Sequence, residues 1–121
     1  MSARVKRQAH TLKLLAKSKP HICKAIIKGS DNDLVKCLSE CAYNVLRGNV
    51  AITKTQKTKL TKYKQKLRKV ADKKTSLKQK RKLVQTGGFL TALLVPLLSA
   101  VIAPLAGEAV KGILKNVKKK R

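Results

Sequence analysis

Residues 30–48 have the sequence SDNDLVKCLSECAYNVLRG. Its apolar residues recur at i, i+4, i+7 and i+11, the spacing of one helical face: Leu34, Leu38, Cys41 and Val45. Ser30 and Asp33 resemble a capping box at its start, and Gly48 suits the end of a helix. No other stretch combines a broad apolar face with nearly balanced charge. We therefore predict that this helix forms the centre of any core.

Two helices are predicted on its N-terminal side. Val5, Leu12 and Leu15 fall on one helical face, with Ser2 as a candidate cap. Pro20 is predicted to open a second, short helix that Gly29 ends, because proline suits the first helical turn. The apolar side of this helix is formed by Ile22, Cys23, Ile26 and Ile27.

A long lysine-rich helix is predicted on the C-terminal side. Thr53 and Gln56 form a second capping box, and an apolar stripe follows it: Leu60, Tyr63, Leu67 and Val70. A further turn or two is expected through Leu77 and Leu83. Because no stretch alternates with a period of two, we predict an all-α protein, with a small four-helix domain over residues 2–72.

Charge divides the chain of 121 residues into zones. Thirty Lys and Arg face five acidic residues, a formal net charge of +25. Residues 51–86 have fourteen basic residues and one acid, whereas residues 87–110 have no basic residue. We predict a basic helical domain (1–72), a basic linker with Gly-Gly (73–88), a separate apolar helical segment (89–110) and a basic tail (111–121). Such a charge favours polyanionic partners, either nucleic acid or an anionic membrane.

The apolar segment contains an uncharged run, residues 89–106, that is long enough for a membrane span. Pro96 and Pro104 would each kink a helix there. Three interpretations stay open. The run spans a membrane, it lies in a membrane interface, or it packs against the N-terminal domain or a partner protein.

The sequence contains no catalytic constellation. It has no nucleophile elbow, no phosphate-binding loop and no plausible acid–base pair, so we predict that the protein is not an enzyme and uses no cofactor or small-molecule substrate. Cys23, Cys37 and Cys41 form no CxxC, and His10 and His21 lie in different segments. We therefore predict no metal site and buried thiols in a reducing compartment.

The main functional signal is the basic run that follows Thr53. Lysine neutralises phosphates without the planar fork by which arginine reads guanine, so binding without sequence specificity is expected. Aromatic residues are limited to Tyr43, Tyr63 and Phe89, which argues against base stacking and favours duplex DNA. The predicted nucleic-acid-binding residues are Lys54, Lys57, Lys62, Lys64, Lys69, Lys73, Lys74, Lys78, Lys80, Arg81 and Lys82.

A basic block, then Gln85-Thr86-Gly87-Gly88-Phe89, then a proline-punctuated run of Leu, Val, Ala and Ile resembles adenovirus core protein X, the precursor of the mu peptide. It is also similar to counterparts in the adenovirus-like Polintons and adintoviruses. The resemblance covers Lys80 to about Val110 and implies that the basic part condenses a double-stranded genome in the virion. It also implies cleavage after Gly88 by a viral cysteine protease, although Gln85 stands where that motif has a large apolar residue. Mu-type proteins are arginine-rich, whereas this chain is lysine-rich.

Three functions follow as hypotheses. The first is a DNA-condensing core protein of a virion or host nucleus, with residues 89–106 facing the capsid interior or a membrane. The second is a membrane-associated or membrane-active protein whose lysines bind anionic headgroups while residues 89–106 insert. The third is a structural module that docks protein partners through residues 30–48 and the apolar segment.

Overall fold

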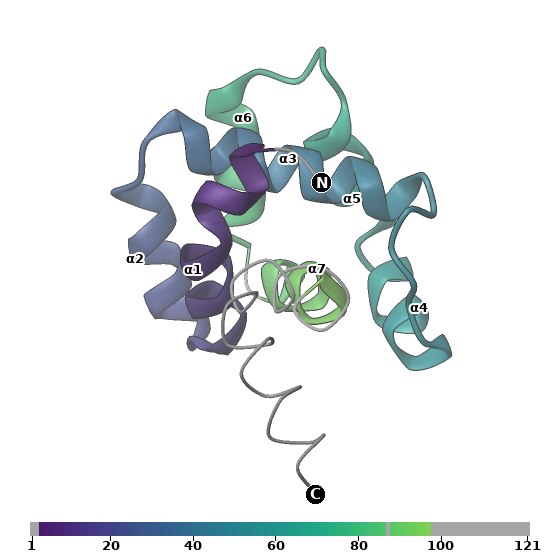
Figure 1. Ribbon diagram of the computed structural model, residues 1–121. Coiled ribbons are helices and arrows are strands. Elements are labelled where there is room, and N and C mark those ends of the chain that lie inside the picture. Colours follow the sequence, from purple (N-terminus) through teal and green to yellow (C-terminus); the bar gives the residue numbers. More distant parts are fainter. Residues whose placement is uncertain (1–2, 87, 98–121) are drawn as a thin grey trace, which may run out of the picture.

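Every element of regular secondary structure in the described residues, 3–86 and 88–97 of this computed structural model, is a helix (Figure 1). The all-α prediction is confirmed for this part of the chain. The helices are α1 (Ala3–Lys17), α2 (Pro20–Lys28), α3 (Asn32–Leu46), α4 (Lys54–Thr61), α5 (Lys64–Ala71), α6 (Leu77–Val84) and α7 (Phe89–Leu97).

Helix α3 lies at the centre of the core, as its apolar spacing predicts. It contacts α1, α5, α6 and α7. Its N-cap is Asp31, whose side chain accepts from the Leu34 N–H at 3.2 Å, so the cap lies one residue beyond the predicted Ser30. Gly48 follows the helix with φ +75°, a conformation that glycine adopts without steric cost. The buried side chains of α3 are Leu34, Val35, Cys37, Leu38, Cys41, Ala42 and Val45.

The two N-terminal helices follow the predicted pattern closely. Pro20 occupies the first turn of α2, and the Gly29 N–H closes its end by donating to Ala25 O at 3.1 Å. Ile22 differs from the prediction, because it lies on the outer face of α2 and is 42% exposed. Ser2 lies outside the described residues. The buried side chains of α1 and α2 are Val5, Ala9, Leu12, Leu15, Cys23 and Ile27.

The prediction of one long helix after Thr53 is wrong, because the chain turns at Tyr63. The Thr53–Gln56 capping box is present, with hydrogen bonds of 2.9 and 3.2 Å. Tyr63 leaves helical geometry at φ −110°, ψ 18°, and its ring packs on Phe89 with centroids 5.8 Å apart. The turn allows α4 to contact α7 while α5 packs along α3, which a straight helix could not do.

A second turn separates α5 from α6. Asp72 takes an extended backbone conformation, and its side chain accepts from the Lys74 N–H at 2.9 Å. Ser76 then caps α6 by accepting from the Gln79 N–H at 3.2 Å. Asp and Ser side chains favour such local bonds over helix continuation. The basic run is therefore divided among three short helices.

Helix α7, the first part of the apolar run, packs on the N-terminal helices, which is one of the three interpretations left open for residues 89–106. It lies between α1 and α4 (Figure 1) and contacts both as well as α3. Phe89, Leu90, Leu93, Leu94 and Leu97 are buried in the same core cluster as the α1 and α3 residues. The reason is that lysine-rich helices offer few apolar side chains of their own, so α7 completes the core. Residues 98–110 of the predicted segment, Pro104 included, lie outside the described residues.

No helix within residues 3–86 and 88–97 is both long and apolar enough to cross a membrane.

Candidate nucleic-acid interface

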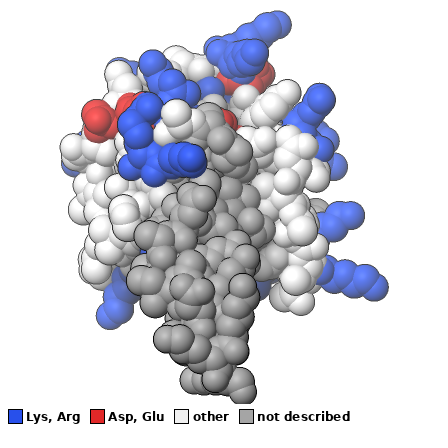
Figure 2. Space-filling model, viewed as in Figure 1, with Lys and Arg blue, Asp and Glu red and all other residues white. Residues whose placement is uncertain are grey.

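Most of the predicted nucleic-acid-binding residues are exposed on α4, α5, α6 and the turns between them. Figure 2 shows basic side chains spread around the periphery of the described surface in one view, rather than gathered into a single patch. The exposed members of the predicted set are Lys54, Lys57, Lys62, Lys64, Lys69, Lys73, Lys74, Lys78 and Lys82.

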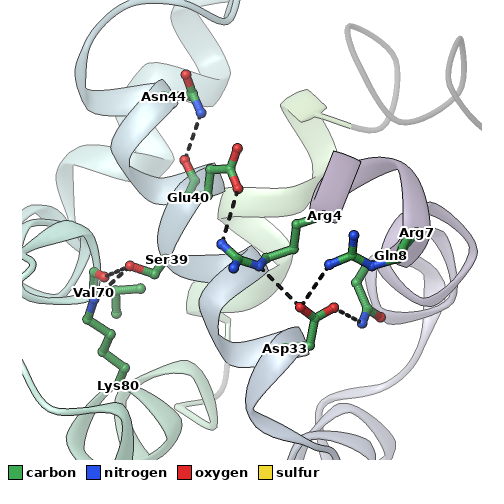
Figure 3. Close-up of polar contacts among 9 residues, drawn as sticks. All are labelled: Arg4, Arg7, Gln8, Asp33, Ser39, Glu40, Asn44, Val70 and Lys80. Carbon is green, nitrogen blue, oxygen red and sulfur yellow. Dashed lines mark hydrogen bonds and ion pairs between the residues drawn. The ribbon is translucent and has the colours of Figure 1, made fainter. Parts of the chain in front are cut away.

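Lys80 differs from the rest of that set, because it faces the protein and is only 6% exposed. On α6 it shares the inward face with Val84, four residues later. Its ammonium donates to Ser39 Oγ at 2.7 Å, and Ser39 in turn donates to Val70 O at 2.7 Å (Figure 3). Burial lowers the pKa of Lys80, partly offset by the attraction of Asp72.

Arg81 also differs from the exposed lysines, because its guanidinium is hydrogen-bonded within the protein. Nη1 donates to Ile27 O at 2.6 Å and to both oxygens of Ser30 at 2.9 Å. Nη2 donates to Asn32 Oδ1 at 3.0 Å. These bonds tie α6 to the connection between α2 and α3 and satisfy carbonyls at the C-terminal end of α2. Arg81 therefore has a structural role in this fold.

Two predicted residues, Lys73 and Lys80, meet in a concavity of about 350 Å³. Arg4 and Lys36 also line it, so cations from α1, α3, α6 and the turn after α5 converge there. Ser39 and Glu40 lie on the same wall, with Glu40 Oε2 at 3.9 Å from Arg4 Nη1. Local patterns in the sequence give no signal for Arg4 or Lys36, since only the packing of α1 on α3 brings them here.

Other basic residues line two further hollows. Lys59 and Lys62 border a groove of about 350 Å³ between α4 and α7, whose other walls include Val95 and Pro96. Lys78 and Lys82 flank a shallow hollow beside Ser76. Lys59 was absent from the predicted set, although it belongs to the same basic run and could have been found by that signal.

The acidic residues of α3 form ion pairs with arginines of α1. Asp33 accepts from Gln8 Nε2 at 2.8 Å, from Arg7 Nη2 at 3.1 Å and from Arg4 Nε at 3.2 Å (Figure 3). The hydrogen bond from Gln8, followed by those from Arg4 and Arg7, lowers the pKa of Asp33 despite partial desolvation. Asp33 is thus a tertiary contact rather than the capping-box residue predicted from its spacing.

The predicted processing site lies between α6 and α7. Gln85 and Thr86 are half-buried, and Phe89 is fully buried as the first residue of α7. Gly88 has φ +84°, and a Cβ there would lie 2.5 Å from Tyr63 Oη. Gly88 therefore has a structural reason to be glycine, independent of any protease. Gly87 lies outside the described residues.

The three cysteines are free and buried, as predicted for structural thiols. Cys23 donates to Leu15 O at 3.1 Å, and burial raises its pKa. A hydrogen bond with Cys37, together with burial, raises the pKa of Cys41 well above its ordinary value. Across the described ranges, no three His, Cys, Asp or Glu side chains are grouped so that they could hold a metal ion.

Comparison of the chain with protein-family models, curated proteins and solved structures gives no match.

Proposed function

We propose that this protein is a non-enzymatic DNA-binding protein that contacts duplex phosphates without sequence specificity and condenses the duplex. The observation that best supports the proposal is the distribution of charge over α4, α5, α6 and the turns between them. Nine predicted lysines are exposed there, and Asp72 is the one acidic residue between positions 51 and 86. A surface of this kind releases counterions from DNA on binding, which is the main source of non-specific affinity.

The few aromatic residues support a duplex rather than a single strand as the ligand. Tyr63 packs on Phe89 inside the protein. Tyr43 is 44% exposed and lies beside Arg47, whose Cζ is 5.7 Å from the ring centroid. One such ring provides no row of stacking platforms for successive bases.

The burial of α7 favours DNA over a membrane as the main partner. Phe89, Leu93 and Leu94 have no exposed surface, and all three belong to the core cluster. Inserting residues 89–97 into lipid would therefore require their removal from that core. Under the membrane hypothesis, insertion without loss of that core would have to use the part of the apolar run that follows Leu97.

The resemblance to adenovirus core protein X supplies the proposed setting. By that resemblance, the protein would condense a linear double-stranded genome in a virion core or a host nucleus. Residues after Leu97 would face the capsid interior.

The decisive experiment measures binding of the full chain to duplex DNA across a salt series. Fluorescence anisotropy with two unrelated random-sequence duplexes should give equal affinities. A protein that neutralises 6–10 phosphates loses about 10³–10⁵ in affinity between roughly 50 and 200 mM salt. Weak binding at the lowest salt, or a preference for one duplex, would refute the proposal. Binding to anionic vesicles that survives high salt would instead support the membrane hypothesis, because apolar insertion is not screened.

Matched charge variants locate the interface. The triple variant Lys57→Gln, Lys64→Gln and Lys69→Gln removes three exposed cations from α4 and α5. The control triple, Lys13→Gln, Lys17→Gln and Lys24→Gln, removes the same charge from α1 and α2. Each lost phosphate contact reduces the salt slope by about 0.9, so the first triple should reduce it by about 2 to 3. Equal effects of the two triples would show that the interface is not on α4–α6.

A further inference from the structure

The concavity between α3, α5 and α6 has the features of a specific anion site. Arg4, Lys36, Lys73 and Lys80 line it, against the single carboxylate of Glu40. Three of these cations come from different helices and the fourth from the turn after α5. Their convergence is thus a product of the tertiary fold and differs from the general spread of lysine over the surface.

Lys80 is the unusual member of this group. A lysine that is only 6% exposed is expected to have its charge neutralised or its donors satisfied. Among the described residues its one hydrogen-bond acceptor is Ser39 Oγ, and no carboxylate lies within ion-pair distance. A lysine ammonium has three donors, so two remain for a group that enters the concavity.

The neighbours of Lys80 hold it in place for such a ligand. Ser39 Oγ donates to Val70 O, which directs its lone pairs toward Lys80 (Figure 3). In the same view Ser39 lies between Lys80 on one side and the Arg4–Glu40 pair on the other. Arg4 is held by Asp33 at 3.2 Å, so part of its guanidinium is fixed before any ligand arrives.

We propose that this concavity binds a phosphate group, with Lys80 as the buried anchor and Arg4, Lys36 and Lys73 around it. A phosphate offers several strong acceptor oxygens and a negative charge, which together satisfy the spare donors of Lys80 and offset its burial. The concavity, of about 350 Å³, has room for a phosphate with part of an ester. The carboxylate of Glu40 lowers the affinity for phosphate, because it lines the concavity and repels an anion there.

The phosphate can come from the DNA backbone or from free phosphate. As a backbone site, the concavity would be one fixed contact among many mobile ones, and this assignment rests on the proposed DNA-binding function. Binding of inorganic phosphate does not rest on it. The two sources are therefore tested in separate arms.

The first arm titrates the full chain with inorganic phosphate at pH 7 and constant ionic strength, replacing chloride. Saturable NMR shifts are expected at the Ser39 amide and at the Lys80 side chain. Lys80→Met should weaken binding about tenfold or more, the worth of one charge-assisted hydrogen bond. Lys73→Met, at an exposed rim position, should weaken it less, and Lys24→Met on α2 controls for the loss of one surface charge.

The second arm repeats the variants with duplex DNA. A larger loss for Lys80→Met than for Lys24→Met assigns the site to a backbone phosphate. Equal losses of DNA affinity in the two variants, together with saturable phosphate binding by the parent chain in the first arm, assign the site to free phosphate. If the chain fails to bind DNA but binds inorganic phosphate saturably, the proposed function is refuted and the phosphate site is supported. Shifts that do not saturate, or phosphate binding that Lys80→Met leaves unchanged, would overturn the inference.

Discussion

Replacing Gly88 with alanine should destabilise this protein more than the same change at Gly48. Both glycines have a positive φ, +84° at Gly88 and +75° at Gly48, so alanine is strained at each. Their surroundings differ. A Cβ at Gly48 would meet no atom within 4 Å, whereas a Cβ at Gly88 would lie 2.5 Å from Tyr63 Oη.

The magnitudes follow from these two contributions. The left-handed conformation costs an alanine about 1–2 kcal/mol, partly offset by about 0.4–1 kcal/mol from the loss of glycine freedom in the unfolded chain. Gly48→Ala should therefore cost on the order of 1 kcal/mol. Gly88→Ala adds an overpacking cost of about 1–3 kcal/mol, because Tyr63 is packed on Phe89 and cannot move freely.

A double-mutant cycle isolates the contact with Tyr63. Tyr63→Phe removes the hydroxyl, and the next nearest atom to the new Cβ is then the ring carbon Cζ at 3.5 Å, an ordinary van der Waals distance. Gly88→Ala should thus cost about 1–3 kcal/mol less in the Tyr63→Phe variant than in the parent chain. The Gly48→Ala cost should be equal in both backgrounds.

Urea denaturation followed by circular dichroism at about 0.3 M salt, which screens the self-repulsion of the chain, measures these free energies. For a domain of this size, 1 kcal/mol corresponds to about 4–8 °C in Tm, so thermal melts provide a second readout. If Gly88→Ala proved no more costly than Gly48→Ala, or if Tyr63→Phe gave no relief, the packing of α7 against Tyr63 would be wrong.

Four further predictions follow from the same contacts. A fragment of residues 1–88 should not fold, because the five side chains of α7 in the core cluster contribute about 10 kcal/mol, comparable to the whole stability of a small domain. A dispersed NMR spectrum of this fragment would contradict the placement of α7. Asp33→Asn should flatten the pH dependence of the free energy of unfolding below about pH 4. Because the pKa of Asp33 is lowered in the folded state, its contribution to stability is present at neutral pH and is lost as the pH falls through the folded-state pKa. An acid titration identical to that of the parent chain would argue against the Arg4–Asp33–Arg7 cluster. Lys80→Met should leave stability at pH 7 unchanged or raise it by about 1 kcal/mol, since a buried ammonium is replaced by an apolar side chain of similar length. A marked decrease in Tm would show that the hydrogen bond to Ser39 contributes more to stability than burial of the ammonium costs. The three thiols should react with a disulfide reagent only as fast as the protein opens, because all are buried and the pKa of both Cys23 and Cys41 is raised. Rapid labelling of the folded chain would be evidence against the α3 core.

Local signals in the sequence were sufficient for the helices whose ends have strong capping residues. The i, i+4, i+7 spacing of α3, Pro20 at the start of α2 and the Thr53–Gln56 box each act within a few residues, and each is present in the fold. The local signals for the other turns were also in the sequence. Asp72 and Ser76 are turn and cap residues, and they divide a basic run that was predicted to continue as one helix.

The candidate interface could be predicted only in its outline. Composition indicated which stretch is basic, and most of its lysines are exposed. It could not separate Lys80 and Arg81 from their neighbours, because their partners Ser39, Ile27 and Ser30 lie about 40 to 55 positions earlier in the chain.

Charge, helical periodicity and capping are all properties of neighbouring residues. They determined that the protein is helical, that α3 is its centre and that residues 51–86 are strongly basic. Two features depend on tertiary packing: Phe89–Leu97 completes the core, and one concavity is lined by Arg4, Lys36, Lys73 and Lys80. The physical reason is that burial depends on the total apolar surface available to the fold. Lysine-rich helices supply too little of it, so they recruit an apolar segment that the charge pattern had set apart.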